Sequence, residues 1–254
     1  MEQYTAWKAL ITSGDPVSAW QKCYVYFYQA FVEADRWKQY LNGVGRTLYV
    51  TALALILGVI LGVIVAVVRT AHDQQRPGHR NPILGVLNVI FKIYVTVIRG
   101  TPMMVQLLIM GFVIFASSKN FALVGALTLG INSGAYQAEI IRGGLMAVDA
   151  GQMEAGRSLG LNYVDTMRFI IIPQAVKAIL PALGNEFIVL LKDTSLISVI
   201  GGKELLYAAR AIVSRTYEAM FPFLGTAVIY LVLVMLFTWL LGIFERRLRA
   251  SDRR

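Results

Sequence analysis

A run of 22 residues without a single charge, 47–68, is the feature that most constrains how this chain can fold. About 20 predominantly apolar residues in a helix cross the hydrocarbon core of a bilayer, so this run has the length of a membrane span. Hydrophobic residues make up 57% of the 254-residue chain, and further apolar runs follow the first. The sequence therefore predicts an all-α integral membrane protein.

We predict about five transmembrane helices, over 47–68, 100–116, 121–141, 178–200 and 221–244. The apolar stretch 83–116 is too long for one span, since 34 helical residues would extend about 51 Å. Gly100 and Pro102 divide it. In its first part, 83–98, polar residues recur every three to four positions, which predicts a helix at the membrane interface. These residues are Asn88, Lys92, Thr96 and Arg99.

The first predicted span also carries small residues at a spacing of four: Ala54, Gly58, Gly62 and Ala66. Such a stripe lets a neighbouring helix approach closely. It marks a helix–helix interface, or it reflects the general abundance of small residues in membrane helices.

The distribution of lysine and arginine predicts the orientation. The segments after the first, third and fifth spans hold 12 of these residues, against eight in the segments on the other side. We therefore expect residues 1–43 to form an extracellular segment, partly at the interface, that precedes a transmembrane domain over 44–246. The basic tail, 247–254, is expected in the cytoplasm, with the chain in the cell membrane.

The composition argues against several other functions. The net charge of +9 arises mostly from basic residues beside apolar segments, as expected for contact with lipid rather than nucleic acid. His72 and His79 lack the cysteine or carboxylate spacing of a metal site. No phosphate-binding loop of the form GxxxxGK[ST] occurs, so the chain is not expected to hydrolyse ATP, and no catalytic residues are predicted.

The segment 142–177, between the third and fourth predicted spans, is too polar to cross a membrane. We predict two short helices in it, joined at Gly160, a residue that tolerates a left-handed helix end. The first covers 152–159. The second begins after Asn162 as the N-cap and ends before Pro173. The loop either docks onto a partner or is a surface turn without one.

The same loop resembles a known signature. Glu154-Ala155-Gly156, Gly160, Ile170 and Pro173 are similar to the loop motif of ABC-transporter permease subunits, with Gly156 in place of alanine and Ile172 in place of leucine. In that family the loop docks into a groove on a separate ATPase subunit. The resemblance thus implies a coupling loop whose docking residues are Glu154, Ala155, Gly156, Leu159, Gly160 and Leu161.

Further motifs resemble permeases of polar amino acids, of the histidine, glutamine and arginine type, over about 44–246. They are Arg99-Gly100-Thr101-Pro102, the stretch 135–144 with Glu139 and Arg142, Gly151-Gln152, and Lys192-Asp193-Thr194-Ser195-Leu196. The resemblance implies a dimer of ATPase subunits that binds ATP and Mg, a second permease copy or paralogue, and an extracellular amino-acid-binding protein. It implies no cofactor on this chain.

Polar residues in the third span fall on one helical face, at spacings of four, four and three. They are Thr128, Asn132, Tyr136 and Glu139, with Ser133 and Gln137 beside them. Intramembrane polar groups usually face a cavity, which favours a substrate path. The alternative is a set of hydrogen bonds that only hold the helices together.

Charged residues also occur in the fourth span, where Lys192 and Asp193 precede Thr194 and Ser195. Lys192 lies seven residues after Asn185, and Asp193 seven after Glu186, so each pair shares an edge of the helix. The two charges line a path for a zwitterion or form an ion pair between helices. Glu139 and Arg142, three residues apart, are expected to pair locally.

Two other classes remain as alternatives. An ion-coupled secondary transporter of amino acids would use the intramembrane carboxylates as ion sites, but such transporters usually contain internal repeats, which five spans do not fit. A membrane scaffold without transport would leave the polar face unexplained.

Overall fold

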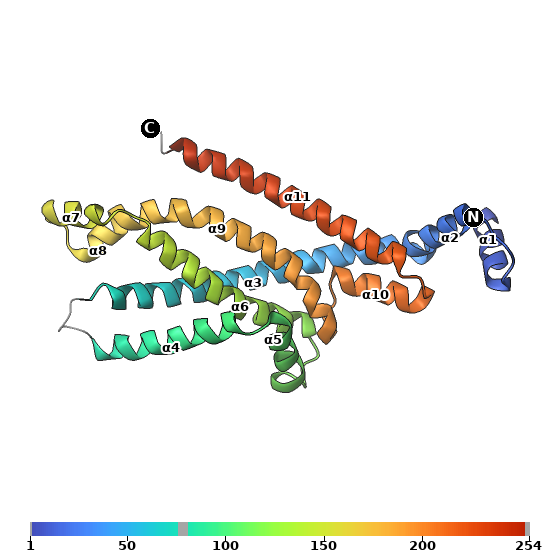
Figure 1. Cartoon of the computed structure of the whole chain (residues 1–254), viewed down its shortest axis with the longest axis horizontal. Helices are drawn as coiled ribbons and strands as arrows, with labels where there is room; N and C mark the ends of the chain where they lie inside the picture. The colour runs from blue at the N-terminus through green and yellow to red at the C-terminus, as the bar shows by residue number, and fades with distance from the viewer. Residues whose placement is uncertain (1, 76–80, 252–254) are drawn as a thin grey trace.

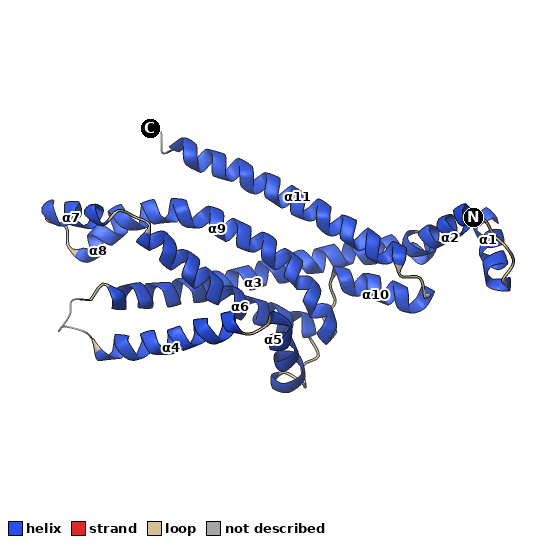
Figure 2. Cartoon of the chain, viewed as in Figure 1, coloured by secondary structure: helices blue, strands red, loops and turns tan. Residues whose placement is uncertain are grey.

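The computed structural model describes residues 2–75 and 81–251, and these fold into helices without a strand (Figure 2). This confirms the all-α prediction. The helices in chain order are α1 (Glu2–Ser13), α2 (Ala19–Phe31), η1 (Glu33–Asp35), α3 (Arg36–Asp73), α4 (Pro82–Gly100), α5 (Met103–Ile109), η2 (Met110–Ile114), α6 (Phe121–Met146), α7 (Ala150–Ser158), α8 (Tyr163–Thr166), η3 (Met167–Ile171), α9 (Ile172–Asp193), η4 (Thr194–Ile200), α10 (Leu205–Thr216) and α11 (Met220–Ser251).

Four helical stretches of the described chain are long and apolar enough to cross a membrane: Glu33–Asp73, Pro82–Gly100, Tyr163–Ile200 and Met220–Leu248. The 26-residue helix α6 is also long enough, at about 39 Å. Its polar side chains, among them Asn132 and Gln137, make it less apolar than the other four. The architecture is thus a multi-pass bundle with about five long helices.

Two of the predicted boundaries are wrong. The segment predicted as the second span, 100–116, forms only α5 and η2, whose 12 residues extend about 18 Å and cannot cross a bilayer. The predicted interfacial helix 83–98 is instead α4, a helix of membrane length. The extended backbone at Thr101 (φ −116°, ψ 145°), followed by Pro102, separates the two helices.

Helix α4 belongs to the bundle because its apolar side packs against α3 and α6. Val95 is buried in a cluster with Val65 of α3 and Ala135 of α6, and Phe91 and Tyr94 pack against the same cluster. Periodicity alone suggested an interfacial helix because one polar stripe is compatible with both positions.

Helices α3 and α6 mesh through glycines on both sides. A Cβ on Gly58 would come within 2.6 Å of Gln137 Nε2, and one on Gly130 within 2.8 Å of Leu57 Cδ2. Gly62 and Gly134 make equally close contacts with Gln137 and Leu61. The small-residue stripe of α3 therefore marks a helix–helix interface, as one of the two interpretations predicted.

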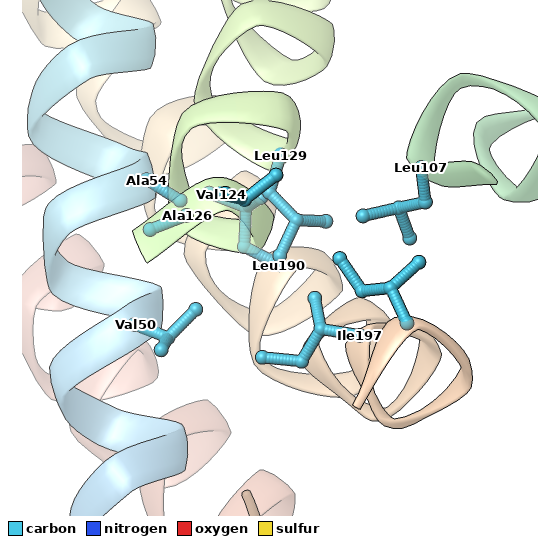
Figure 3. Close-up of a cluster of buried hydrophobic side chains, with 9 residues drawn as sticks. Val50, Ala54, Leu107, Val124, Ala126, Leu129, Leu190 and Ile197 are labelled. Carbon is cyan, nitrogen blue, oxygen red and sulfur yellow. The ribbon is translucent and has the colours of Figure 1, made fainter. Parts of the chain in front are cut away.

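The largest apolar cluster joins α3, α5, α6 and the end of the α9–η4 helix (Figure 3). Leu107 of α5 and Ile197 of η4 are fully buried in it. Its other members are Val50, Ala54, Val124, Ala126, Leu129, Leu190 and Ile200. The short helix α5 is thus held by the core rather than by the membrane.

Several helices gather at the two ends of the molecule (Figure 1). The C-terminal end of α3, the N-terminal end of α4, the pair α7 and α8, and the C-terminal end of α11 lie at one end. Helices α1, α2 and α10 lie at the other. The predicted division at residues 43 and 44 falls inside α3, which begins at Arg36. The N-terminal segment therefore continues directly into the first membrane helix.

Candidate functional site

The loop between α6 and α9 forms two helical arms, α7 and α8. Asp149 caps α7 by accepting a hydrogen bond at Oδ1 from the Gly151 backbone N–H (2.7 Å). Asn162 caps α8 in the same way, with Oδ1 accepting from the Asp165 N–H (2.9 Å). Side-chain acceptors at these positions satisfy backbone donors that a helix start leaves free. The predicted cap at Asn162 is confirmed.

The two arms meet at Gly160, which has a φ of +81°. The Gly160 N–H donates to the Arg157 carbonyl (2.9 Å), and the Leu161 N–H donates to the Gly156 carbonyl (3.0 Å). This pair of hydrogen bonds is a Schellman motif, which ends a helix with one residue in the left-handed region. The predicted glycine elbow is therefore present.

The second arm does not end at Pro173 as predicted. The chain is helical from Tyr163 to Ile200, with a π-helical turn over Met167–Ile171. The Ile172 N–H donates to the Met167 carbonyl, and Pro173 follows in the first turn of α9, where its missing N–H does not interrupt the helix. The second arm is thus continuous with the fourth membrane helix.

The tip of the loop presents apolar side chains to the solvent. Leu159 is 78% exposed, Glu154 and Ala155 are exposed, and Leu161 is half-buried. Gly156 is buried against Thr166 of the other arm. Val164 and Phe169, which the sequence motifs did not predict, are also strongly exposed. Apolar residues in an otherwise polar loop were the signal that could have identified them.

The Arg99–Pro102 turn is tied to α6 by Gln106 of α5. Gln106 Nε2 donates to the Ile98 carbonyl (2.8 Å) and to Thr101 Oγ1 (2.7 Å), while its Oε1 accepts from Asn132 Nδ2 (2.9 Å). The guanidinium of Arg99 lies 5.1 Å from the centre of the Tyr136 ring, a cation–π contact. The structure thus brings this motif to the predicted polar face of α6.

The remaining polar residues of α6 divide into two groups. The Thr128 hydroxyl is buried and donates to the carbonyl of Val124 in its own helix (2.7 Å). Gln137 Nε2 donates to Ser133 Oγ (2.8 Å), and Ser133 in turn donates to Glu186 Oε1 of α9 (2.8 Å). Gln137 Oε1 is buried without a hydrogen-bond partner among the described residues. A polar chain therefore runs from α6 to α9 inside the bundle.

Lys192 and Asp193 lie at the end of α9, with Lys192 exposed and Asp193 half-buried. Neither side chain forms an ion pair within 4 Å among the residues that the structure describes. The hydroxyls of Thr194 and Ser195 donate to the carbonyls of Leu191 (2.7 Å) and Lys192 (2.8 Å). Within the described part of the chain, no ion pair therefore holds either charge against another helix.

A row of four charges, linked by three ion pairs, joins the ends of α3 and α6. Glu139 accepts from Arg142 Nη2 (3.2 Å), as predicted, and also forms an ion pair with Arg69. Arg142 Nη1 lies 4.0 Å from Asp73 Oδ2 at the end of α3, which extends the row to four charges. Sequence spacing could suggest the pair within α6 but not the two residues of α3.

His72 lies beside this row of charges, with Nδ1 3.1 Å from Asn88 Nδ2 and 3.4 Å from Asp73 Oδ1. Among the described residues, no group of three or more histidine, cysteine, aspartate or glutamate side chains could hold a metal ion. His79 lies outside the described residues.

A buried carboxylate, Glu204, caps α10 at the opposite end of the molecule. It is 1% exposed and accepts from the N–H groups of Leu206 (2.7 Å) and Tyr207 (2.6 Å) and from the Tyr230 hydroxyl (2.9 Å). Burial raises the pKa of Glu204 to about 7, although these donors act in the opposite direction.

The fold and these sites define a multi-pass helical membrane protein with a two-armed loop exposed at one end and a polar chain inside. Comparison with known proteins identifies the family of this chain. Residues 81–250 match the family model of the binding-protein-dependent transport system inner membrane component. The chain therefore belongs to this family.

Two curated relatives cover most of the chain. A putative glutamine transport system permease protein from Rickettsia bellii is 34% identical over 214 residues, covering 83% of this chain and 93% of the relative. The glutamine transport system permease protein of Escherichia coli K12 is 32% identical over 213 residues, covering 82% and 92%.

Solved structures show the same fold. A crystal structure of an amino acid ABC transporter with histidines matches with a TM-score of 0.74 and 42% identity, covering 83% of this chain and 94% of the other. The MetNI methionine ABC transporter in an inward-facing conformation matches with a TM-score of 0.72 at 20% identity, covering 86% and 99%. The latter likeness concerns the fold alone.

Proposed function

We propose that this chain is the transmembrane permease subunit of an ATP-binding-cassette importer for polar amino acids. It forms the substrate path and couples to a separate ATPase subunit. The observation that carries the proposal is the exposed two-armed loop with its glycine elbow, in a chain whose relatives are named as glutamine permeases. The related amino acid transporter with histidines supports the same substrate class.

The loop has the properties of a docking element. Large apolar side chains are costly to expose to water and usually mark a contact surface when they cluster. Leu159, directly before the elbow fixed at Gly160, is 78% exposed. Glu154 adds a negative charge on the first arm. We assign the docking role to Glu154, Ala155, Gly156, Leu159, Gly160 and Leu161.

For the substrate path we propose the polar face of α6 and the end of α9. An amino acid carries an ammonium and a carboxylate, so Asp193 and Lys192, which lack an ion pair among the described residues, suit both ends of it. Asn132 and Tyr136 connect this path to the Arg99–Pro102 turn. The remaining path residues proposed are Thr128, Gln137, Thr194 and Ser195.

The assembly that we propose contains two permease subunits, identical or paralogous, around a two-fold or pseudo-two-fold axis. ATP and Mg bind to a dimer of ATPase subunits, and an extracellular binding protein delivers the amino acid. The loop and the C-terminal end of α11 lie at the end of the molecule that we place in the cytoplasm, with the N-terminal helices outside (Figure 1). The membrane lipid surrounds the bundle.

Charge reversal at the loop tests the docking. Glu154→Lys should reduce the yield of ATPase subunit that co-purifies with a tagged chain, while the membrane fold is retained. Asp15→Lys, at an exposed acidic residue of the opposite end, is the matched control and should keep the wild-type yield. Wild-type recovery of the ATPase and normal transport by Glu154→Lys would exclude the loop as the docking element.

Uptake by proteoliposomes that contain the co-purified complex and its binding protein tests the substrate class. Labelled glutamine, glutamate, histidine, arginine and leucine form a suitable panel. ATP-dependent uptake of a polar member, but not of leucine, is expected. Uptake by the purified chain alone, driven by an ion gradient without ATP, would instead establish a secondary transporter.

A further inference from the structure

The coupling loop touches the end of α3 through a hydrogen bond between residues 89 positions apart. The Tyr163 hydroxyl donates to Gln74 Oε1. Tyr163 is the first residue of α8 and follows the elbow directly, whereas Gln74 is the C-cap of α3. The contact thus joins the second arm of the loop to the first membrane helix (Figure 1).

The loop is internally rigid. Thr166 is fully buried against Gly156 of the other arm, and the Schellman motif fixes the turn between them. Gln174 Nε2 of α9 also donates to Gln152 Oε1 of α7 (3.2 Å). A force applied to the tip therefore moves both arms together.

Apolar packing alone does not fix this unit to α3. A cavity of about 480 Å³ lies between α3, α6, α8, η3 and α9. Its walls include Val67, Thr70, Leu145, Val164, Met167 and Leu183. This open pocket separates most of the second arm from α3, and few contacts join the two arms to α3 among the described residues. The hydrogen bond at the edge of this cavity then sets their relative position.

The end of α3 is in turn fixed to α6. The row of charges Arg69, Glu139, Arg142 and Asp73 alternates in sign, and two of its three ion pairs cross between the two helices. The ion pair between Arg69 and Glu139 is largely shielded from solvent, with side chains 15% and 24% exposed. Displacement of α3 should therefore carry α6, and with it the polar face, in the same direction.

We infer that Tyr163 is a positioning residue that transmits the movement of the docked loop, through Gln74, to α3 and α6. This inference rests on the proposed function. The hydrogen bond persists during the transport cycle and acts as a strut, a fixed link between the loop and α3. Without it, ATP hydrolysis continues but is no longer coupled to the movement of the helices.

Removal of one oxygen atom tests the strut. Tyr163→Phe in the complete reconstituted transporter should keep the yield of bound ATPase subunit and the rate of ATP hydrolysis. The amount of glutamine or histidine taken up per ATP should fall about fivefold, roughly the factor that one neutral hydrogen bond is worth. Tyr49→Phe, on an exposed side chain of α3, is the matched control and should not change this ratio.

The partner residue supplies a double-mutant cycle. Gln74→Leu should lower uptake per ATP as Tyr163→Phe does, and the double variant should be no worse than either single variant. Gln74→Glu keeps an acceptor oxygen and should retain the wild-type ratio. Additive losses, or a normal ratio in Tyr163→Phe, would overturn the inference.

Different results would contradict the proposed transport function and the role of the Tyr163–Gln74 hydrogen bond. A wild-type chain that binds no ATPase subunit and shows no ATP-dependent uptake contradicts the proposed function itself. A wild-type chain that transports normally, together with a Tyr163→Phe variant of unchanged uptake per ATP, contradicts only the strut.

Discussion

Gly156 in α7 and Thr166 in α8 lie in direct contact, since a Cβ on Gly156 would come within 2.6 Å of Thr166 Cγ2. This contact explains why glycine occupies the position at which the related loop signature has alanine. Thr166 is fully buried, and its hydroxyl donates to the Asn162 carbonyl (2.8 Å), so it cannot move aside. The two arms therefore pack at the closest distance that their backbones allow.

Gly156→Ala should destabilise the loop by about 1–3 kcal/mol through overpacking. The second change Thr166→Ala removes the obstructing atoms and should restore the loop. Amide hydrogen exchange over 150–171 and recovery of the ATPase subunit are the measurements. Gly242→Ala, where an added Cβ has open space, is the control and should show no such effect. Equal protection in Gly156→Ala and the wild-type chain would contradict the close packing.

Gly160→Val should misalign the arms because a β-branched residue resists the φ of +81° at this position. Gly160→Asn should be much milder, since asparagine tolerates the left-handed region. Recovery of the ATPase subunit, compared with expression level, measures the effect. Gly85→Ala in α4, at a position without nearby atoms, is the matched control. Valine and asparagine variants of equal activity would argue against the elbow.

Lys192→Met and Asp193→Asn should each reduce amino acid uptake without a large loss of stability. Neither residue has an ion-pair partner among the described residues, so neither change breaks an ion pair there. Breaking a buried ion pair would instead cost about 3–5 kcal/mol. Thermal unfolding in detergent and uptake in vesicles are the two measurements.

The double variant Lys192→Met, Asp193→Asn separates the interpretations. Singly unstable variants whose stability recovers in the double variant would show that the two residues pair, in this chain or across subunits. Normal uptake by a stable double variant would remove both residues from the path and leave only the α6 face.

Stability should fall as the pH rises through the titration of Glu204. Its pKa is about 7 in the folded chain against an ordinary value of 4.5, so the folded state binds the proton more tightly than the unfolded state. The contribution is complete below pH 4.5, is lost between about 4.5 and 7, and amounts to roughly 3 kcal/mol. Unfolding temperature measured from pH 4 to 8 should show this loss.

Glu204→Gln should flatten that pH dependence because the amide cannot ionise, while its oxygen still accepts from the cap of α10. Glu2→Gln, at an exposed residue, is the control and should keep the wild-type profile. A Glu204→Gln variant with an unchanged pH profile would show that another group titrates.

Much of the fold could be predicted because single residues specify local structure. Gly160 and Asn162 indicated the elbow and the second arm, and the spacing of Gly58 and Gly62 indicated a close helix contact. The prediction that 83–98 lies at the interface and 100–116 crosses the membrane was wrong. A hydrophobic segment can be buried in lipid or in the protein core, and hydrophobicity alone does not distinguish the two. Leu107 of α5 enters the protein core, which only the folded arrangement reveals.

The sites divide in the same way. The pair of Glu139 and Arg142 follows from helical spacing, but Arg69 lies 70 residues away and joins them only because α3 packs against α6. The same holds for Ser133 with Glu186 and for Tyr163 with Gln74. Contacts between two helices depend on how each helix is rotated about its axis and on its position along the bundle. The periodicity of one helix does not determine either.

The meshing of α3 and α6 also limits how this sequence can diverge. Leu57 occupies the space that Gly130 leaves, and Leu61 that of Gly134. A larger residue at either glycine position requires a smaller residue opposite. Substitutions at this helix–helix interface should therefore covary in related sequences. A chimera that combined α3 from one relative with α6 from another would bring together unmatched surfaces. Such hybrids should fail at assembly even where each helix alone inserts normally.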